Sequence, residues 1–323
     1  MKNLVRTVGI GALVCGLFAG ESGAFPRLLT KTADGDAQME LGEYHGLKHA
    51  IGCKEFENQS GWAGQWQIGE NLSIMLESAL FDTGRFVIVE REKLGDVLGE
   101  QDLAASGRTA AAKKVARTGL VRPARYIGSG AVTEVSEETA GGVGGISIKG
   151  IRVGGGKSKA HLAIIAKLID TTTGEIVAKK RIVGEAGRAK VNLGLSFRGV
   201  STEMGGFSKT PLGEAAQDCI NQAAVFFAQT MEAYPFEGSV VKVSGDRVII
   251  NRGSKYGVAP GATFVMKEEG ELLTDPDTGE ILGREEGVEL GRLKVEKVLE
   301  KMSYCEVLSG EKDPPAGTRV TGE

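Results

Sequence analysis

Two glycine-rich stretches set the architecture of this chain: TAGGVGGISIKGIRVGGGKSKAHL at residues 139–162 and VGEAGRAKVNLGLSFRGVSTEMGGFS at residues 183–208. Apolar and polar residues alternate in both, and a period of two is typical of β-strands with one apolar and one polar face. The apolar positions are Val143, Ile146, Ile148, Ile151, Val153, Val191, Leu193, Leu195 and Phe197. We therefore interpret each stretch as an extended β-hairpin whose apolar face needs an apolar partner.

Lipid is the first candidate for that partner. Alternating segments of about ten residues are typical of transmembrane β-strands. Two hairpins supply too few strands to close a barrel, so this interpretation predicts a ring of several subunits. The alternative is a glycine-rich β-arm that packs on a neighbouring subunit outside the membrane. The change of alternation between Lys149 and Arg152 indicates a strand end or a turn near Gly150.

Composition excludes several classes of function. The net charge of −3 argues against nucleic acid as a partner. The 48 glycines favour strands and turns. We find no nucleophile elbow, CxxC pair or paired-carboxylate motif, so we expect neither an enzyme nor a cofactor. Cys53, Cys219 and Cys305 are too few and too scattered for a disulfide framework, and we expect buried thiols.

The N-terminus resembles a secretory signal peptide over residues 1–24. Lys2 and Arg6 precede an apolar run, which ends before the small residues 22–24. That run is too short to span a bilayer. Lipidation at Cys15 is an alternative to simple secretion, although Val14 is a poor lipobox residue. Residues 25–46 read as an N-terminal arm.

Residues 47–234 read as one mixed domain that carries the two hairpins. The predicted strands are 47–56, 86–90, 161–170 and 175–183, and the predicted helices are 68–80, 91–103 with an alanine-rich extension over 104–116, and 212–233. From residue 235 onward the pattern changes to short strands separated by Gly and Asp turns. It predicts a small all-β module over 235–323.

Three motifs carry a resemblance to a known family. They are FVIVER at 86–91 with Leu94, GGVG at 141–144 and TGEI at 173–176. In this order the chain, over roughly residues 45–233, resembles the CsgG/HfaB family of curli-secretion channel subunits and holdfast-anchoring relatives. The resemblance implies an α+β fold, with a periplasmic α/β domain that sends two hairpins into a shared outer-membrane β-barrel. About nine subunits would give the roughly 36 strands of the largest known barrels.

The family also has a loop after its first strand that narrows the channel with aromatic and amide side chains. The matching loop here carries Trp62, Gln65, Trp66 and Asn71, which we predict to line a constriction. The alternative is that the tryptophans cover an edge of the hydrophobic core. The loop is shorter than in the family, and the module from Phe236 is absent from the curli channel. That module resembles small C-terminal β domains of periplasmic flagellar and envelope assembly proteins.

Other motifs are weak. Residues 154–158 resemble the end of a phosphate-binding loop, but Ile151 stands where that motif requires glycine. His45 and His49 have metal-binding spacing without a third ligand. The acidic residues of the turn at 275–280 more often form only a turn than a calcium site. We therefore expect no metal.

The sequence thus predicts a subunit of an oligomeric outer-membrane secretion channel or anchoring complex, facing the periplasm, that passes or holds exported polypeptide. Its expected partners are copies of itself, the exported chain, outer-membrane lipid and periplasmic accessory proteins. The alternative function is a non-pore periplasmic scaffold for cell-envelope assembly. Detergent dependence distinguishes the two, because only a barrel requires detergent for extraction.

Overall fold

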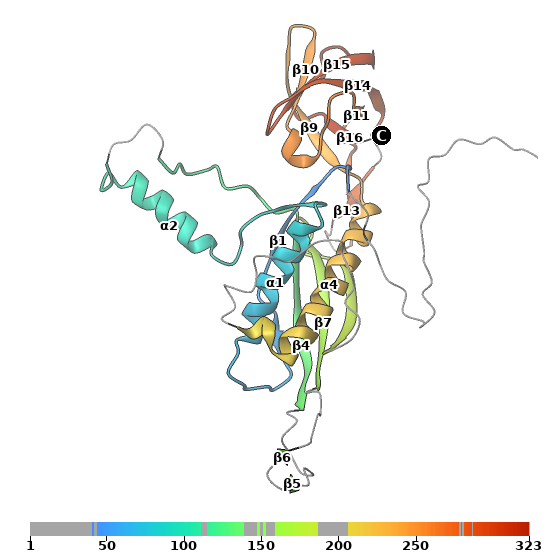
Figure 1. Cartoon of the computed structure of the whole chain (residues 1–323). Coiled ribbons are helices and arrows are strands. Elements are labelled where there is room, and N and C mark those ends of the chain that lie inside the picture. Colours follow the sequence, from blue (N-terminus) through green and yellow to red (C-terminus); the bar gives the residue numbers. More distant parts are fainter. Residues whose placement is uncertain are drawn as a thin grey trace, which may run out of the picture. The chain divides into compact units, whose positions relative to one another are not determined.

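Runs of β-branched and small residues build a central sheet with the strand order β3-β1-β4-β7-β8, and β2 pairs with β4 at its side. The strands are β1 (His49–Cys53), β2 (Glu57–Asn58), β3 (Phe86–Ile88), β4 (Tyr126–Glu138), β7 (Lys159–Asp170) and β8 (Ile176–Glu185). β1 runs parallel to β3 and β4, whereas β4, β7 and β8 form an antiparallel meander. This mixed sheet agrees with the predicted α+β class (Figure 1).

This computed structural model describes residues 41, 44–110, 115–138, 147–148, 151–152, 159–186, 206–277, 279, 281–285 and 287–322. All of them belong to one compact unit, Met39–Glu323. None of the described helices is both long and apolar enough to cross a membrane.

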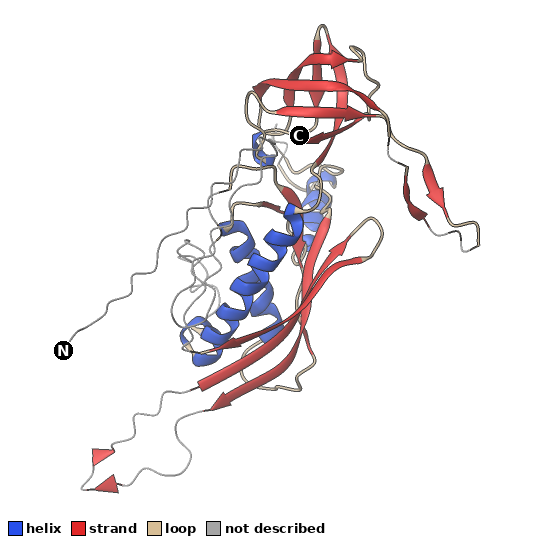
Figure 2. Cartoon of the chain, turned by 90° about the vertical axis from the view of Figure 1, so that its right-hand side faces the viewer, coloured by secondary structure: helices blue, strands red, loops and turns tan. Residues whose placement is uncertain are grey.

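Helices α1 (Ile68–Asp82) and α4 (Pro211–Glu232) cover one face of the sheet (Figure 2). The apolar residues of α1 recur at helical spacing and are buried, which confirms the helix predicted from residue 68. α4 begins at a capped end, because the hydroxyl of Thr210 accepts a hydrogen bond from the amide of Gly213 at 3.0 Å and Pro211 occupies the first turn. Both helices pack on the β1-β4-β7-β8 surface to form the main core.

Helix α2 (Leu94–Ala105) differs from the other two because it buries only one residue, Gln101. The predicted alanine-rich extension to residue 116 is wrong for the described residues, since neither 106–110 nor 115–116 is helical. The cause is Gly107, whose φ of 73° lies in the left-handed region that terminates helices. Residues 108–110 and 115–116 are exposed, so no burial offsets the effect of this glycine.

The predicted all-β C-terminal region is a closed barrel with the strand order β10-β15-β14-β11-β16-β9. Its strands are β9 (Glu237–Ser244), β10 (Arg247–Ile250), β11 (Thr263–Lys267), β14 (Glu289–Val298), β15 (Ser303–Gly310) and β16 (Arg319–Gly322). A hairpin of β12 (Leu272–Thr274) and β13 (Ile281–Arg284) extends from it (Figure 2). Alternate side chains such as Phe264, Met266 and Leu293 fill the interior.

The three cysteines of the described residues are unpaired and buried, as expected. Burial raises the pKa of Cys305 to about 12, and it raises the pKa values of Cys53 and Cys219 further. These thiols stay protonated at neutral pH and behave as small apolar side chains.

Part of the first glycine-rich stretch is a short hairpin of β5 (Ser147–Ile148) and β6 (Ile151–Arg152). Ser147 pairs with Arg152 and Ile148 with Ile151, so the chain reverses between residues 148 and 151, where the sequence indicated a turn. The margins of the two stretches, 159–162 and 183–185, lie in β7 and β8. The remaining predicted membrane positions lie outside the described residues: Val143, Ile146, Val153, Val191, Leu193, Leu195 and Phe197.

Candidate functional site

Both glycine-rich stretches leave the sheet at the same end. Glu138, the last residue of β4, pairs with Lys159, the first residue of β7, so the first stretch connects these two positions. The second stretch leaves the sheet after Glu185 at the end of β8, and Glu185 lies opposite His161 of β7. The chain returns at the 3-10 helix η1 (Phe207–Lys209), just before α4. We refer to this end of the sheet, where the two stretches leave strands β4, β7 and β8, as the hairpin end (Figure 2).

The tryptophan-containing loop runs toward the same end. It follows β1 and begins with β2, which pairs in parallel with β4 at Ala131 and Val132. The amide of Gln59 donates to the carbonyl of Val132 at 2.9 Å, so the loop is attached to the strand that continues into the first hairpin. The parallel pairing places the loop between residues 58 and 67 near the hairpin end (Figure 1).

Hydrogen bonds within the loop fix its path. The side-chain amide of Asn58 donates to the carbonyl of Trp62 at 2.9 Å. The hydroxyl of Ser60 donates to Oδ1 of Asn58 at 2.7 Å and accepts from the amide of Trp62 at 3.2 Å. Such side-chain bonds to the backbone hold a turn without regular secondary structure. The loop is therefore ordered by its own sequence.

The predicted constriction residues fall into three environments. Trp62 and Trp66 are half-buried against the main core, and the ring of Trp66 lies 5.5 Å from that of Phe207 in η1. Gln65 is exposed between them. Asn71 lies in α1, where its amide donates to the carbonyl of Gln67 at 3.0 Å, so it is a helix residue rather than a loop residue. The packing of both tryptophans on the main core agrees with the alternative interpretation, in which they cover an edge of the core.

Phe207 is a residue that the sequence did not indicate. It is fully buried, and it packs on the tryptophan loop from the end of the second glycine-rich stretch. No local pattern relates two residues so distant in the chain. The tryptophan loop thus contacts the C-terminal end of the second glycine-rich stretch.

A cavity of about 480 Å³ lies beside the loop. Its lining includes Glu55, Glu57, Trp66 and the start of α1. Gly69 is required here, because a Cβ atom at this position would lie 2.1 Å from the carbonyl oxygen of Phe56. The cavity offers carboxylate and aromatic surface, which suits contact with a polypeptide by size and hydrogen bonding rather than by bond-making chemistry.

An ionic cluster lies on the adjoining sheet surface. Glu134 of β4 accepts from Arg181 of β8 at 2.7 Å, and Nε2 of His161 of β7 lies 3.4 Å from the same carboxylate. The hydrogen bond and the charge of Arg181 lower the pKa of Glu134. The cluster links all three strands of the meander next to the point where the hairpins begin.

The weak metal motifs do not form sites in the described part of the chain. His49 lies in β1, so it cannot share a helix face with His45. Burial lowers the pKa of His49 to about 4, with the charges of Arg125 and Arg252 adding to the shift. Among the described residues no group of three His, Cys, Asp or Glu side chains could hold a metal ion. Asp275 instead accepts from the amide of Asp277 at 2.7 Å in a turn.

The fold and this end of the sheet define a mixed α/β protein in which two glycine-rich stretches leave the sheet beside an ordered aromatic loop. Residues 37–250 match the family model for the curli production assembly/transport component CsgG. The match covers well over half of the sequence, and the chain belongs to the CsgG family. This confirms the resemblance carried by the motifs at 86–91, 141–144 and 173–176.

Comparison with solved structures gave matches of low identity and low TM-score. The hypothetical protein CT253 from Chlamydia trachomatis is 8% identical, with 58% of this chain and 99% of that chain covered and a TM-score of 0.34. A PelC dodecamer from Paraburkholderia phytofirmans is 15% identical, with 59% and 93% covered and a TM-score of 0.26. Lipoprotein GNA1162 from Neisseria meningitidis is 14% identical, with 50% and 99% covered and a TM-score of 0.25. Comparison with curated proteins gave no match.

Proposed function

We propose that this protein is a subunit of an oligomeric outer-membrane channel or anchoring complex that passes or holds an exported polypeptide. The observation that carries the proposal is the meander β4-β7-β8, which directs both glycine-rich stretches from one end of the sheet in a member of the CsgG family. Transport through such a ring is passive. The width and lining of the ring select an extended polypeptide. Trapping of that polypeptide on the far side gives the transport its direction.

The geometry of the meander supports continuation into membrane strands. β4 has 13 residues and β7 has 12, and their antiparallel pairing persists to Glu138 and Lys159, where the first stretch begins. A ladder that is still paired at its last residues can continue its register into the next segment without a new turn. The alternating residues beyond it then present one apolar face to lipid.

Helix α2 supports assembly of several copies. Its apolar side chains Val97, Leu98 and Leu103 are 39%, 44% and 40% exposed, although the helix has a Leu and Val content typical of a packed one. Burying a side chain of this kind contributes about 1.5–3 kcal/mol. We propose that a second copy of the chain covers this face in the ring.

Substitution Leu98→Asp is therefore expected to weaken the contact between subunits more than tenfold, because a carboxylate would replace a buried apolar group. Native mass spectrometry in mild detergent would show loss of the ring in favour of smaller species. The subunit itself should keep its melting temperature, since Leu98 is 44% exposed and lies outside both described hydrophobic cores. Val288→Asp is the matched control, because Val288 is 68% exposed and lies outside α2. Rings that survive Leu98→Asp would contradict the role of α2.

The tryptophan loop is proposed to line the passage at the hairpin end. Trp62 and Trp66 give aromatic surface and Gln65 an amide, which contact an extended polypeptide by stacking and hydrogen bonding. The half-buried tryptophans then have two roles, since their inner faces also cover the core. Gln65 is the residue that tests the passage alone, because it is exposed.

Gln65→Trp is expected to lower single-channel conductance in planar bilayers at least twofold, because every subunit adds an indole to the narrowest part. Glu175→Trp, in the β7–β8 turn at the opposite end of the sheet, serves as the control for a surface tryptophan. Equal conductance of Gln65→Trp and the unmodified protein would place the loop outside the passage and leave it as a cover for the core.

The experiment that tests the whole proposal is fractionation of cell envelopes followed by electron microscopy of the extracted material. Detergent-dependent rings with a stain-filled centre are the expected result. A soluble oligomer that washes off without detergent would overturn the channel and support the alternative scaffold, for which the tight packing of Trp66 on Phe207 is the favouring observation.

A further inference from the structure

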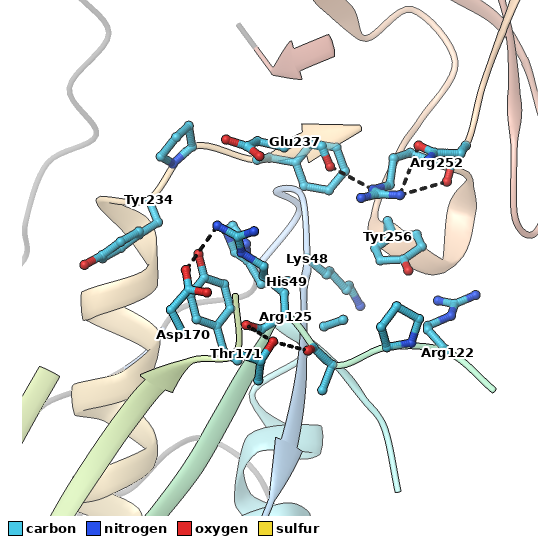
Figure 3. A pocket seen from close by; sticks show the side chains of 17 residues that line it. Lys48, His49, Arg122, Arg125, Asp170, Thr171, Tyr234, Glu237, Arg252 and Tyr256 are labelled. Carbon is cyan, nitrogen blue, oxygen red and sulfur yellow. Dashed lines mark hydrogen bonds and ion pairs between the residues drawn. The ribbon is translucent and has the colours of Figure 1, made fainter. Parts of the chain in front are cut away.

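A second cavity, of about 550 Å³, lies at the end of the sheet opposite the hairpins. The starts of β1 and β4 form one side, and the barrel residues around Arg252 and Tyr256 form the other (Figure 3). The amide of Lys48 donates to the carbonyl of Tyr256 at 2.9 Å, and Ala50 and Val87 share a core with the barrel. The cavity is thus bounded by direct contacts between the sheet and the barrel.

Positive charge exceeds negative charge in this cavity. Lys48, Arg122, Arg125 and Arg252 line it, together with the carboxylates Asp170 and Glu237. Both carboxylates are already engaged. Asp170 lies 3.1 Å from Arg125, and Glu237 is bound by Arg319 on the neighbouring strand. In the described part of the chain no carboxylate forms an ion pair with Arg122 or Arg252.

Those two arginines meet at one aromatic ring. The Cζ atoms of Arg122 and Arg252 both lie 4.8 Å from the centre of the Tyr256 ring. Arg252 is fixed, since its Nε donates to the carbonyl of Glu237 at 2.9 Å and its Nη1 to Oδ1 of Asn251 at 3.0 Å (Figure 3). Burial lowers the pKa of Arg252, and the charge of Arg122 adds to this effect.

Arg122 has an unsatisfied donor. Its Nη1 atom is buried and has no hydrogen-bond partner among the described residues. A buried donor without a partner costs about 1–3 kcal/mol, and it is rare in folded proteins unless a ligand supplies the acceptor. Two guanidinium groups with no counter-ion between them add electrostatic repulsion, which an anion would remove.

We propose that Arg122 and Arg252 form a binding site for a phosphate group. The planar guanidinium matches the geometry of phosphate oxygens, and stacking on Tyr256 holds both groups in place before binding. The cavity is much larger than an inorganic ion and falls within the range of small-molecule sites. Its aromatic walls, Tyr126, Phe236 and Tyr256, would contact the organic part of the ligand. A soluble phosphate ester and a phospholipid headgroup share this chemistry.

The test is isothermal titration of the full chain, as purified in detergent, with inorganic phosphate and with glycerol 3-phosphate at low salt. Arg122→Gln is expected to weaken binding at least tenfold. Its melting temperature without ligand should change little, because loss of the contact with the Tyr256 ring is offset by relief of the repulsion from Arg252 and of the unsatisfied donor. Arg108→Gln, an exposed arginine remote in sequence from the cavity, is the control and should bind as the unmodified protein does.

Flotation with phosphatidylglycerol vesicles distinguishes the two sources. Loss of vesicle binding in Arg122→Gln alone identifies a lipid headgroup, whereas an effect confined to glycerol 3-phosphate identifies a soluble ester. Absence of binding by the unmodified protein to all three probes, or equal binding by Arg122→Gln, overturns the site. Ring formation is scored separately by microscopy, so failure here leaves the channel proposal untouched.

Discussion

Substitution Leu195→Arg is expected to remove the protein from the membrane fraction. Leu195 belongs to the alternating apolar set of the second glycine-rich stretch. An arginine on the lipid face of a membrane strand costs about 2–4 kcal/mol near the bilayer centre. In a ring every subunit carries the substitution, so the total cost multiplies with the number of subunits and exceeds what insertion can tolerate. Separation of outer membranes on a density gradient, followed by immunodetection, measures the loss.

The neighbouring substitution Ser196→Arg is the matched control. Adjacent residues of a strand point to opposite faces, so this arginine would enter the aqueous lumen and membrane insertion should be kept. The two variants therefore differ only in the face of the strand on which the arginine lies. If both lose the membrane fraction, or if both keep it, the alternation does not define a lipid face and the β-arm alternative is favoured.

Substitution Gly184→Ala is expected to have the largest effect on stability. Gly184 lies in β8, where α4 crosses the sheet, and a Cβ atom there would stand 2.1 Å from the carbonyl oxygen of Ala215 and 2.9 Å from the amide nitrogen of Cys219. Both are backbone atoms, so the helix must move as a whole. The same crossing carries a hydrogen bond from the Cys219 thiol to the carbonyl of Leu162 at 3.3 Å.

Displacement of α4 disturbs the main core, since most of its buried residues pack there. Overpacking typically costs about 1–3 kcal/mol, and a backbone clash belongs at the upper end or beyond. We expect a fall in melting temperature of about 6–12 °C by circular dichroism, from roughly 2–4 °C per kcal/mol for a domain of this size.

Gly99→Ala tests the explanation with the same chemical change. Gly99 lies in α2, and a Cβ atom there meets nothing within 4 Å. Replacing a helical glycine by alanine stabilises by about 0.5–1 kcal/mol, so the melting temperature should rise slightly. A comparable fall in both variants would show that glycine flexibility, rather than close approach of α4, is what Gly184 provides.

Local patterns predicted much of the α/β framework. The helical spacing of Ile68, Leu72 and Leu76 predicted α1, and the turn at 171–174 predicted β7 and β8 within two residues at each end. These elements are encoded locally, because burial of one face imposes the period of the element. The predicted extension of α2 to residue 116 was wrong because the described residues of that segment bury no face. Alanine favours a helix, but residues 106–110 and 115–116 are exposed, and Gly107 ends the helix.

The candidate site was predicted less completely than the framework. The sequence indicated the loop and its tryptophans, yet Asn71 was counted among the loop residues although the helix predicted from residue 68 already contained it. It gave no sign of Phe207, which packs on Trp66, nor of Arg122 and Arg252, which meet at Tyr256. The contacts of Phe207 with Trp66 and of Arg122 with Tyr256 join residues far apart in the chain, and no period or spacing relates such residues.

The sequence by itself determined the alternation of the glycine-rich stretches, the order of the strands and helices, and the motifs of the CsgG family. These are properties of neighbouring residues, and backbone geometry translates them directly into strands, turns and helices. The tertiary structure alone decided that both stretches leave one end of the sheet and that four cations gather at the other. Both depend on how β4, β7 and β8 pair and where the barrel contacts the sheet, and packing over long sequence separations sets those relations.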